Sequence, residues 1–88
     1  MFTGIIERTG TIVTVRQEGS NKRFTVQSDI SAELKIDQSV AHNGVCLTVV
    51  AVTGDTHEVV AIGETLDKSS LGGLAEGSTI NLERCMAA

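Results

Sequence analysis

The sequence predicts an all-β fold, with a closed or nearly closed barrel of about six strands. Val, Thr and Ile together supply 27 of the 88 residues, and these branched side chains fit a pleated sheet better than a helix. Nine glycines recur at short intervals and proline is absent, so Gly, Asn and Asp must form the turns. Closure into a barrel is the simplest way for such strands to avoid exposed edges.

Alternating apolar and polar residues define the individual strands. They are expected at 9–16, 23–28, 38–42, 45–53, 56–62 and 78–84. Phe24 and Val26 should face the core from the second strand, and Ile80 and Leu82 from the last.

The connecting segments are polar or rich in glycine. Residues 17–22 are expected to form a turn. Residues 29–37 predict a short helix whose first turn Asp29 could cap. Residues 64–76, with their paired Ser and Gly, predict a loop with room for one helical turn.

Composition excludes several classes of protein. Seven basic and 11 acidic residues give a net charge of −4, and Phe2 and Phe24 are the only aromatics, which argues against nucleic-acid binding. No apolar run approaches the roughly 20 residues of a membrane span, and the first ten residues do not resemble a secretory signal. We therefore expect a soluble, cytoplasmic protein with a single domain over residues 1–88.

The cysteine and histidine content argues against a metal site. Two cysteines are too few for a disulfide framework or a zinc cluster. The two histidines, His42 and His57, have no ligand spacing relative to them. His42 beside a turn is expected at the surface rather than as a base, and His57 at the start of a strand is expected to face solvent.

The pair Asn43-Gly44 is the strongest local signal, because it is typical of a two-residue β-hairpin turn. Such a turn fixes the register, so one face of the hairpin should carry Ser39, Ala41, Cys46 and Thr48. The opposite, mainly apolar face should carry Val40, His42, Val45, Leu47 and Val49 and lie against the core.

The small polar face has two interpretations. Hydroxyl and thiol groups gathered there suit a flat heterocycle that needs close approach and a few hydrogen bonds. The alternative is an ordinary strand face, because Ser and Thr are common on solvated strands and Cys often acts as a small hydrophobe. These residues alone leave both interpretations open.

Five segments then occur in one order: MFTGIIE at 1–7, SVAHNGVCLTV at 39–49, ETL at 64–66, Leu71-Gly72 and NLER at 81–84. In this order and spacing the chain resembles the N-terminal half of the riboflavin synthase family over its whole length. The resemblance implies a six-stranded antiparallel Greek-key barrel with a short helix or helical turn, one of two tandem barrels in a trimeric enzyme. It also implies conversion of two 6,7-dimethyl-8-ribityllumazine molecules to riboflavin and a ribitylamino-pyrimidinedione, without metal or organic cofactor.

The resemblance also assigns site residues by position. Phe2, Ser39 and Cys46 match residues implicated in catalysis. Ligand contacts are implied for an opening segment that reaches the partner barrel, for the hairpin strand and for the segment beyond the next strand. They are Gly4, Ile5, Ile6, Cys46, Leu47, Thr48, Val60, Ala61, Ile62, Gly63, Glu64 and Thr65.

Two departures qualify the resemblance. The family continues into a second barrel, so a chain that ends at Ala88 is expected to be a truncated form that binds lumazine or riboflavin with weak or no turnover. It is expected to self-associate, as a dimer if it acts alone. The stretch 67–70 also differs from the family's usual Arg-Thr-Asn.

Other functions remain open at this point. The chain could be a non-catalytic protein that carries lumazine or flavin, or a structural barrel without a small ligand.

Overall fold

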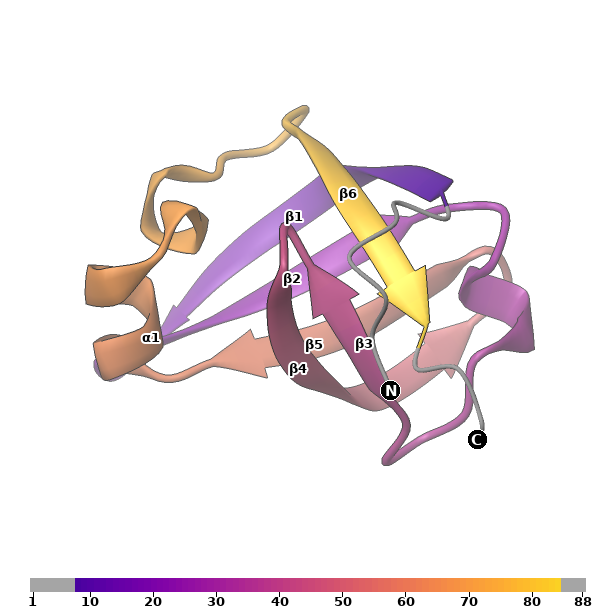
Figure 1. Cartoon of the computed structure of the whole chain (residues 1–88), viewed down its shortest axis with the longest axis horizontal. Coiled ribbons are helices and arrows are strands. Elements are labelled where there is room, and N and C mark those ends of the chain that lie inside the picture. Colours follow the sequence, from indigo (N-terminus) through magenta and orange to yellow (C-terminus); the bar gives the residue numbers. More distant parts are fainter. Residues whose placement is uncertain (1–7, 85–88) are drawn as a thin grey trace.

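Six antiparallel strands close into a barrel in the computed structural model, which describes residues 8–84 (Figure 1). They are β1 (Arg8–Glu18), β2 (Asn21–Gln27), β3 (Ser39–His42), β4 (Val45–Thr53), β5 (Thr56–Ala61) and β6 (Thr79–Arg84). Their order around the barrel is β1-β2-β5-β4-β3-β6. Tight turns join β3, β4 and β5, and β2 lies beside β5, which is a Greek-key arrangement. The predicted fold class is confirmed.

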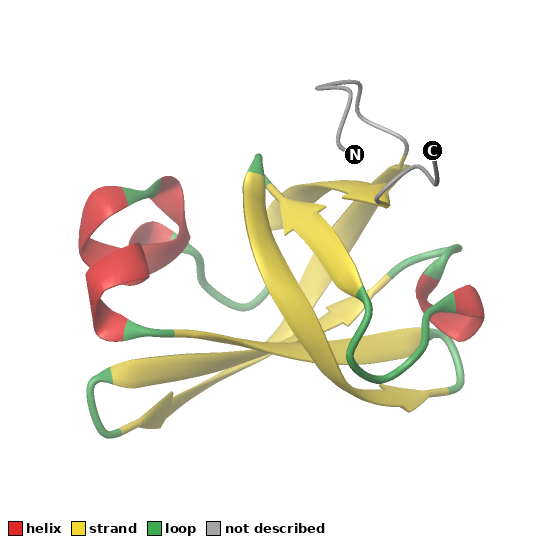
Figure 2. Ribbon diagram, turned by 60° about the horizontal axis from the view of Figure 1, so that its bottom comes forward, coloured by secondary structure: helices red, strands yellow, loops and turns green. Residues whose placement is uncertain are grey.

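Helical segments cover the two ends of the barrel. The helix α1 (Gly63–Lys68) and the 3-10 turn η2 (Ser70–Gly73) lie at one end, and the 3-10 turn η1 (Ser31–Glu33) lies at the other (Figure 2). The predicted loop at 64–76 therefore holds more helix than the one turn expected. Within residues 8–84, no helix is both long and apolar enough to cross a membrane.

Two local predictions need correction. The short helix expected within 29–37 is a single 3-10 turn whose N-cap is Ile30, without a side-chain cap, so the capping role expected of Asp29 is wrong. The turn between β1 and β2 is also shorter than 17–22, because β1 extends to Glu18 and β2 begins at Asn21. Gly19 adopts a φ of 64°, which allows the chain to reverse within two residues.

Side chains fill the interior of the barrel. Phe24, Val26, Ile80 and Leu82 are buried as predicted. They pack in one cluster with the other buried apolar residues, which are Ile12, Ile30, Leu34, Val40, Leu47, Val49, Val59, Ala61 and Leu71. Such an interior is a packed core, so a small ligand can approach this barrel only from outside.

The seam between β3 and β6 closes the barrel, and the turn residue Asn43 contributes to it directly. The Asn43 N–H donates to the carbonyl of Asn81 at 2.8 Å, and the Asn81 N–H donates to Asn43 Oδ1 at 2.8 Å. Asn43 also adopts a φ of 51°, a region that asparagine tolerates better than most residues. The residue that forms the hairpin turn thus also fastens it to the neighbouring strand.

We predict that Asn43→Ala lowers the free energy of unfolding by about 1–2 kcal/mol. The change removes the acceptor for the Asn81 N–H and places alanine at positive φ. Asn43→Asp keeps an acceptor oxygen and tolerates the same backbone region, so it should lose clearly less. Urea unfolding of both variants measures the difference, and equal losses would contradict the role assigned to the hydrogen bond.

Candidate ligand-binding site

The β3–β4 hairpin has the register that the Asn43-Gly44 turn predicts. Ser39 pairs with Thr48, Ala41 with Cys46 and His42 with Val45. Cys46 and Thr48 are exposed and Ser39 is half-buried, so their side chains share the outer surface of the barrel wall. We call these three residues the hairpin face. Ala41 lies on the same side of the sheet but is 4% exposed, which leaves the polar members accessible.

The hairpin face lies beside a break in the barrel wall. The pairing of β4 with β5 runs from Thr53–Thr56 to Val49–Val59 and passes a bulge between Val49 and Ala51. Beyond Val49, residues 45–48 of β4 pair only with β3 within the described chain. Val60 and Ala61 of β5 pair with β2. Thr48 on β4 and Val60 on β5 therefore lie directly beyond the last pair, Val49–Val59, where the two strands no longer pair with each other.

Backbone groups line both sides of this break. Hydrogen-bonded and non-bonded pairs alternate along an antiparallel ladder, and the pair that flanks a two-residue turn is bonded. Val45 and Leu47 therefore direct their N–H and C=O groups to β3, whereas Cys46 and Thr48 direct theirs away from it. The bonds from Val49 to Gln38 and Asp37 agree with this alternation.

The same alternation applied to β5 turns the N–H and C=O of Val60 toward β4. The break thus offers strand-like donors and acceptors from two sides. A planar heterocycle with polar edges can take the place of the missing strand contacts.

The start of α1 forms the far border of the break. Ile62 is 54% exposed, which leaves an apolar side chain open to solvent at this border. The backbone N–H of Gly63 donates a hydrogen bond to Asn21 Oδ1 at 3.2 Å. Glu64 is exposed and pairs with Lys68 at 2.7 Å, and Thr65 is half-buried. Polar and apolar groups are therefore both available at this border.

The structure separates the sequence-predicted site residues into groups. The side chains of Cys46, Thr48 and Val60 point outward on the two sides of the break, with Ser39 beside them. Those of Leu47 and Ala61 are buried in the core, so only their backbone can reach a ligand. The predicted positions in the opening segment lie outside the described residues; they are Phe2, Gly4, Ile5 and Ile6.

A buried polar chain crosses the interior. The hairpin register placed His42 on the core face, which is confirmed, but the surface position expected of His42 and the solvent-facing position expected of His57 are wrong. His42 and His57 are both 0% exposed, and their Nε2 atoms lie 2.9 Å apart. His42 Nδ1 lies 2.9 Å from the carbonyl of Val40, and His57 Nδ1 lies 2.7 Å from Ser31 Oγ. His42 belongs to the inward face of the hairpin, and the alternation along β5 turns His57 inward. This alternation along the strands was the sequence signal that could have predicted the burial of both histidines.

The hydrogen-bond partners of the two rings determine which nitrogen of each histidine carries the proton. A carbonyl can only accept, so His42 Nδ1 donates to Val40 and a neutral His42 must accept at Nε2. His57 then donates from Nε2 and accepts at Nδ1 from the Ser31 hydroxyl. Ser28 completes the chain by donating to Ser31 at 2.7 Å. Protonation of His42 breaks this chain, because two protonated Nε2 atoms cannot share one hydrogen bond.

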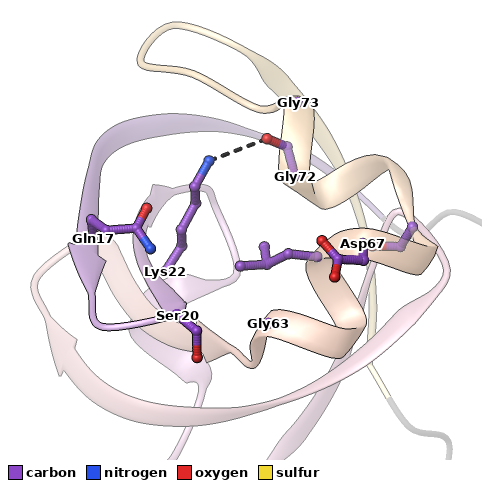
Figure 3. Close-up of a pocket in the computed structure, with 9 residues that line it drawn as sticks. Gln17, Ser20, Lys22, Gly63, Asp67, Gly72 and Gly73 are labelled. Carbon is purple, nitrogen blue, oxygen red and sulfur yellow. Dashed lines mark hydrogen bonds between the residues drawn. The ribbon is translucent and has the colours of Figure 1, made fainter.

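A separate cleft of about 550 Å³ lies between the β1–β2 hairpin and the α1–η2 segment (Figure 3). Gln17, Ser20 and Lys22 line one side and Asp67 the other, with Lys22 Nζ donating to the carbonyl of Gly72 at 3.2 Å. Leu66 is the one large apolar residue that lines it. A flat aromatic ligand needs more apolar surface than this cleft supplies.

Taken together, the strand order and the packed interior define a Greek-key barrel whose open strand edges lie on the outside of its wall. A family model of the lumazine-binding domain matches residues 3–85, and the chain belongs to that family.

Known proteins with similar sequences are riboflavin synthases. The enzyme of Bacillus amyloliquefaciens is 40% identical over 89 residues, and that of Bacillus subtilis (strain 168) is 44% identical over 89 residues. Each match covers 100% of this chain but 41% of the relative. The chain therefore spans about two fifths of the length of the curated relatives it matches.

Similar solved structures come from the protein LumP. Its complex with 6,7-dimethyl-8-(1'-D-ribityl) lumazine aligns with a TM-score of 0.89 and 26% identity, covering 99% of this chain and 49% of that one. Its complex with riboflavin aligns with a TM-score of 0.88 and 26% identity, covering 96% of this chain and 46% of that one.

We predict that the buried histidines make the barrel sensitive to acid. Burial lowers the pKa of His42 from 6.5 to about 4, and burial together with the charge of His42 lowers the pKa of His57 to about 4. The unfolded chain, with its imidazoles near 6.5, takes up protons first as the pH falls. The free energy of unfolding should therefore have its full value above pH 6.5. It should decrease between about pH 6.5 and pH 4, by on the order of 3 kcal/mol per histidine.

Urea unfolding at a series of pH values measures this dependence. His57→Gln, which removes one titrating group, should show a shallower decrease over the same window. Parallel curves for the two proteins would contradict the assignment of the acid sensitivity to this pair.

Proposed function

We propose that this barrel binds 6,7-dimethyl-8-ribityllumazine and riboflavin at the break between β4 and β5, as the N-terminal barrel of a riboflavin synthase. The observation that carries the proposal is the match of the lumazine-binding family model to residues 3–85. The similarity to riboflavin synthases and to LumP in complex with these ligands supports it. The open backbone edges at Cys46, Thr48 and Val60 give a physical reason for the location.

In this proposal, the pyrimidinedione edge of the ligand bonds to the open edges as a strand would. A lumazine or flavin ring has alternating donors and acceptors along that edge, which match the N–H and C=O groups of a strand. Thr48 and the β5 border, from Val60 through Thr65, then flank the ring. Gly4, Ile5 and Ile6 are proposed to reach the ligand of a partner barrel.

The proposed reaction needs two lumazines held together. One loses a proton from its 7-methyl group and the other is attacked at C7, and a four-carbon unit passes between them to give riboflavin and the pyrimidinedione. Holding two identical rings in the correct orientation supplies much of the rate enhancement. Ser39 and Cys46 are the proposed proton-transfer or nucleophilic groups on this barrel, together with Phe2 near the reacting atoms.

A second candidate function is a carrier of lumazine or flavin without turnover. The alignment with LumP in complex with riboflavin, with the ribityl lumazine and with flavin mononucleotide favours it. The two functions share the ligand site and differ in catalysis. Incubation of this chain, joined to a second barrel, with the lumazine separates them, because only a synthase releases riboflavin.

We predict that riboflavin and 6,7-dimethyl-8-ribityllumazine each bind saturably to the chain. The protein contains no Trp and no Tyr, so ligand fluorescence and anisotropy report binding without interference. Thr48→Val should weaken binding by about three- to tenfold, because it removes one hydroxyl from the proposed site at similar volume.

Thr11→Val is the matched control. Thr11 is also an exposed strand threonine but lies on β1, away from the break, so its variant should bind normally. Absence of saturable binding by the unaltered chain, or equal weakening by both variants, would overturn the proposed site.

A further inference from the structure

The buried histidine pair lies where it can control the curvature of β4. His42 pairs with Val45 at the start of β4, and His57 pairs with Val52 near its end. The bulge between Val49 and Ala51 lies between these two points. The 2.9 Å contact between the imidazoles therefore connects the two neighbours of a strongly bent strand across its inner side (Figure 1).

The segment of β4 between these two positions carries two residues of the hairpin face. Cys46 and Thr48 lie between the positions paired to the two histidines, and the break in the β4–β5 ladder begins in the same segment. A change in the distance between β3 and β5 would change how far β4 diverges from β5. The backbone groups on the two sides of the break would then move relative to each other.

The rings are held at both ends, which makes the connection stiff. The carbonyl of Val40 fixes His42, and Ser31 on η1 fixes His57, with Ser28 behind it. No buried side-chain nitrogen or oxygen within the described residues lacks a partner. A fully bonded polar chain inside an apolar core favours one arrangement over its alternatives.

Charged side chains also lie on the elements around the rings. Glu33 of η1 pairs with Arg84, and Glu58 of β5 pairs with Arg23. Glu83 of β6 lies opposite Ala41, adjacent to the strand position of His42. Within residues 8–84, the rings hydrogen-bond to each other, to the Ser31 hydroxyl and to the Val40 carbonyl.

We propose that His42 and His57 are positioning residues of the lumazine-binding face, and that their Nε2–Nε2 hydrogen bond sets the separation of the β4 and β5 edges that hold the ring. The proposal rests on the proposed function, because it concerns the same site. Neither histidine touches the ligand. They act from inside the wall, through β3 and β5, on groups that face outward.

Riboflavin titration of three variants tests the proposal. His57→Leu removes the hydrogen bond and should weaken riboflavin binding at least tenfold, under conditions where circular dichroism shows a folded barrel. His57→Gln keeps an amide donor toward His42 and should stay within about threefold of the unaltered chain. Ile80→Val lowers stability elsewhere in the core and should leave the affinity unchanged.

A spectroscopic measurement on the unaltered chain avoids dependence on any variant's folding. The protein has two histidines, so its imidazole ¹⁵N spectrum contains signals from these two rings only. Saturation with riboflavin should shift the Nε2 signals of both rings, because the hydrogen bond responds to the position of the edges. Signals from a merely structural pair would not move.

The outcomes separate the two proposals. Failure of the unaltered chain to bind either riboflavin or the lumazine would overturn the proposed function. Normal binding by His57→Leu, unmoved imidazole signals, or an equal loss in Ile80→Val would overturn the positioning role while leaving the proposed function intact.

Discussion

The double pairing of β4 is the constraint on which the rest of this small barrel depends. Its first half pairs with β3 and its second half with β5, so the strand must bend sharply between them. The bulge between Val49 and Ala51 provides the bend, since an extra residue increases local twist and curvature. The same bend opens the ladder beyond Val49–Val59. Closure of the barrel and the break in its wall thus have one cause.

The size of the chain explains why the proposed ligand site lies on the outside of the wall. The six strands enclose a core of apolar side chains around Phe24 and Ile12, and the buried histidine pair crosses it. What remains accessible is the wall, and most of its backbone groups are already paired. Within the described residues, the backbone groups of Cys46, Thr48 and Val60 at the break face no paired strand, so another molecule can bond to the main chain there.

Local sequence signals predicted most of this arrangement. The Asn43-Gly44 turn fixed the register of the hairpin and hence the outward position of Ser39, Cys46 and Thr48. The burial of Phe24, Val26, Ile80 and Leu82 followed from strict alternation. These features depend on residues close in sequence, so a short window contains the information needed.

The hydrogen-bond partners of the histidines show where local signals fail. Alternation alone places His42 on the core side, but a buried imidazole is stable only with partners, and these come from Ser31, His57 and the Val40 carbonyl. Ser31 and His57 are 26 residues apart in sequence, and no local pattern joins them. The open edge of β4 could not be predicted for the same reason, because it depends on where β5 ceases to pair with β4.

The geometry of the break gives a physical reason for a second barrel in proteins of this kind. In the proposed site the ring bonds to the strand edges through its own edge, so this barrel leaves one face of the ring uncovered. A reaction that joins two identical rings requires that uncovered face, because the second ring must approach it closely and in a fixed orientation. In the proposed reaction, a second barrel with its own open edge would supply both the partner ring and the shield from water.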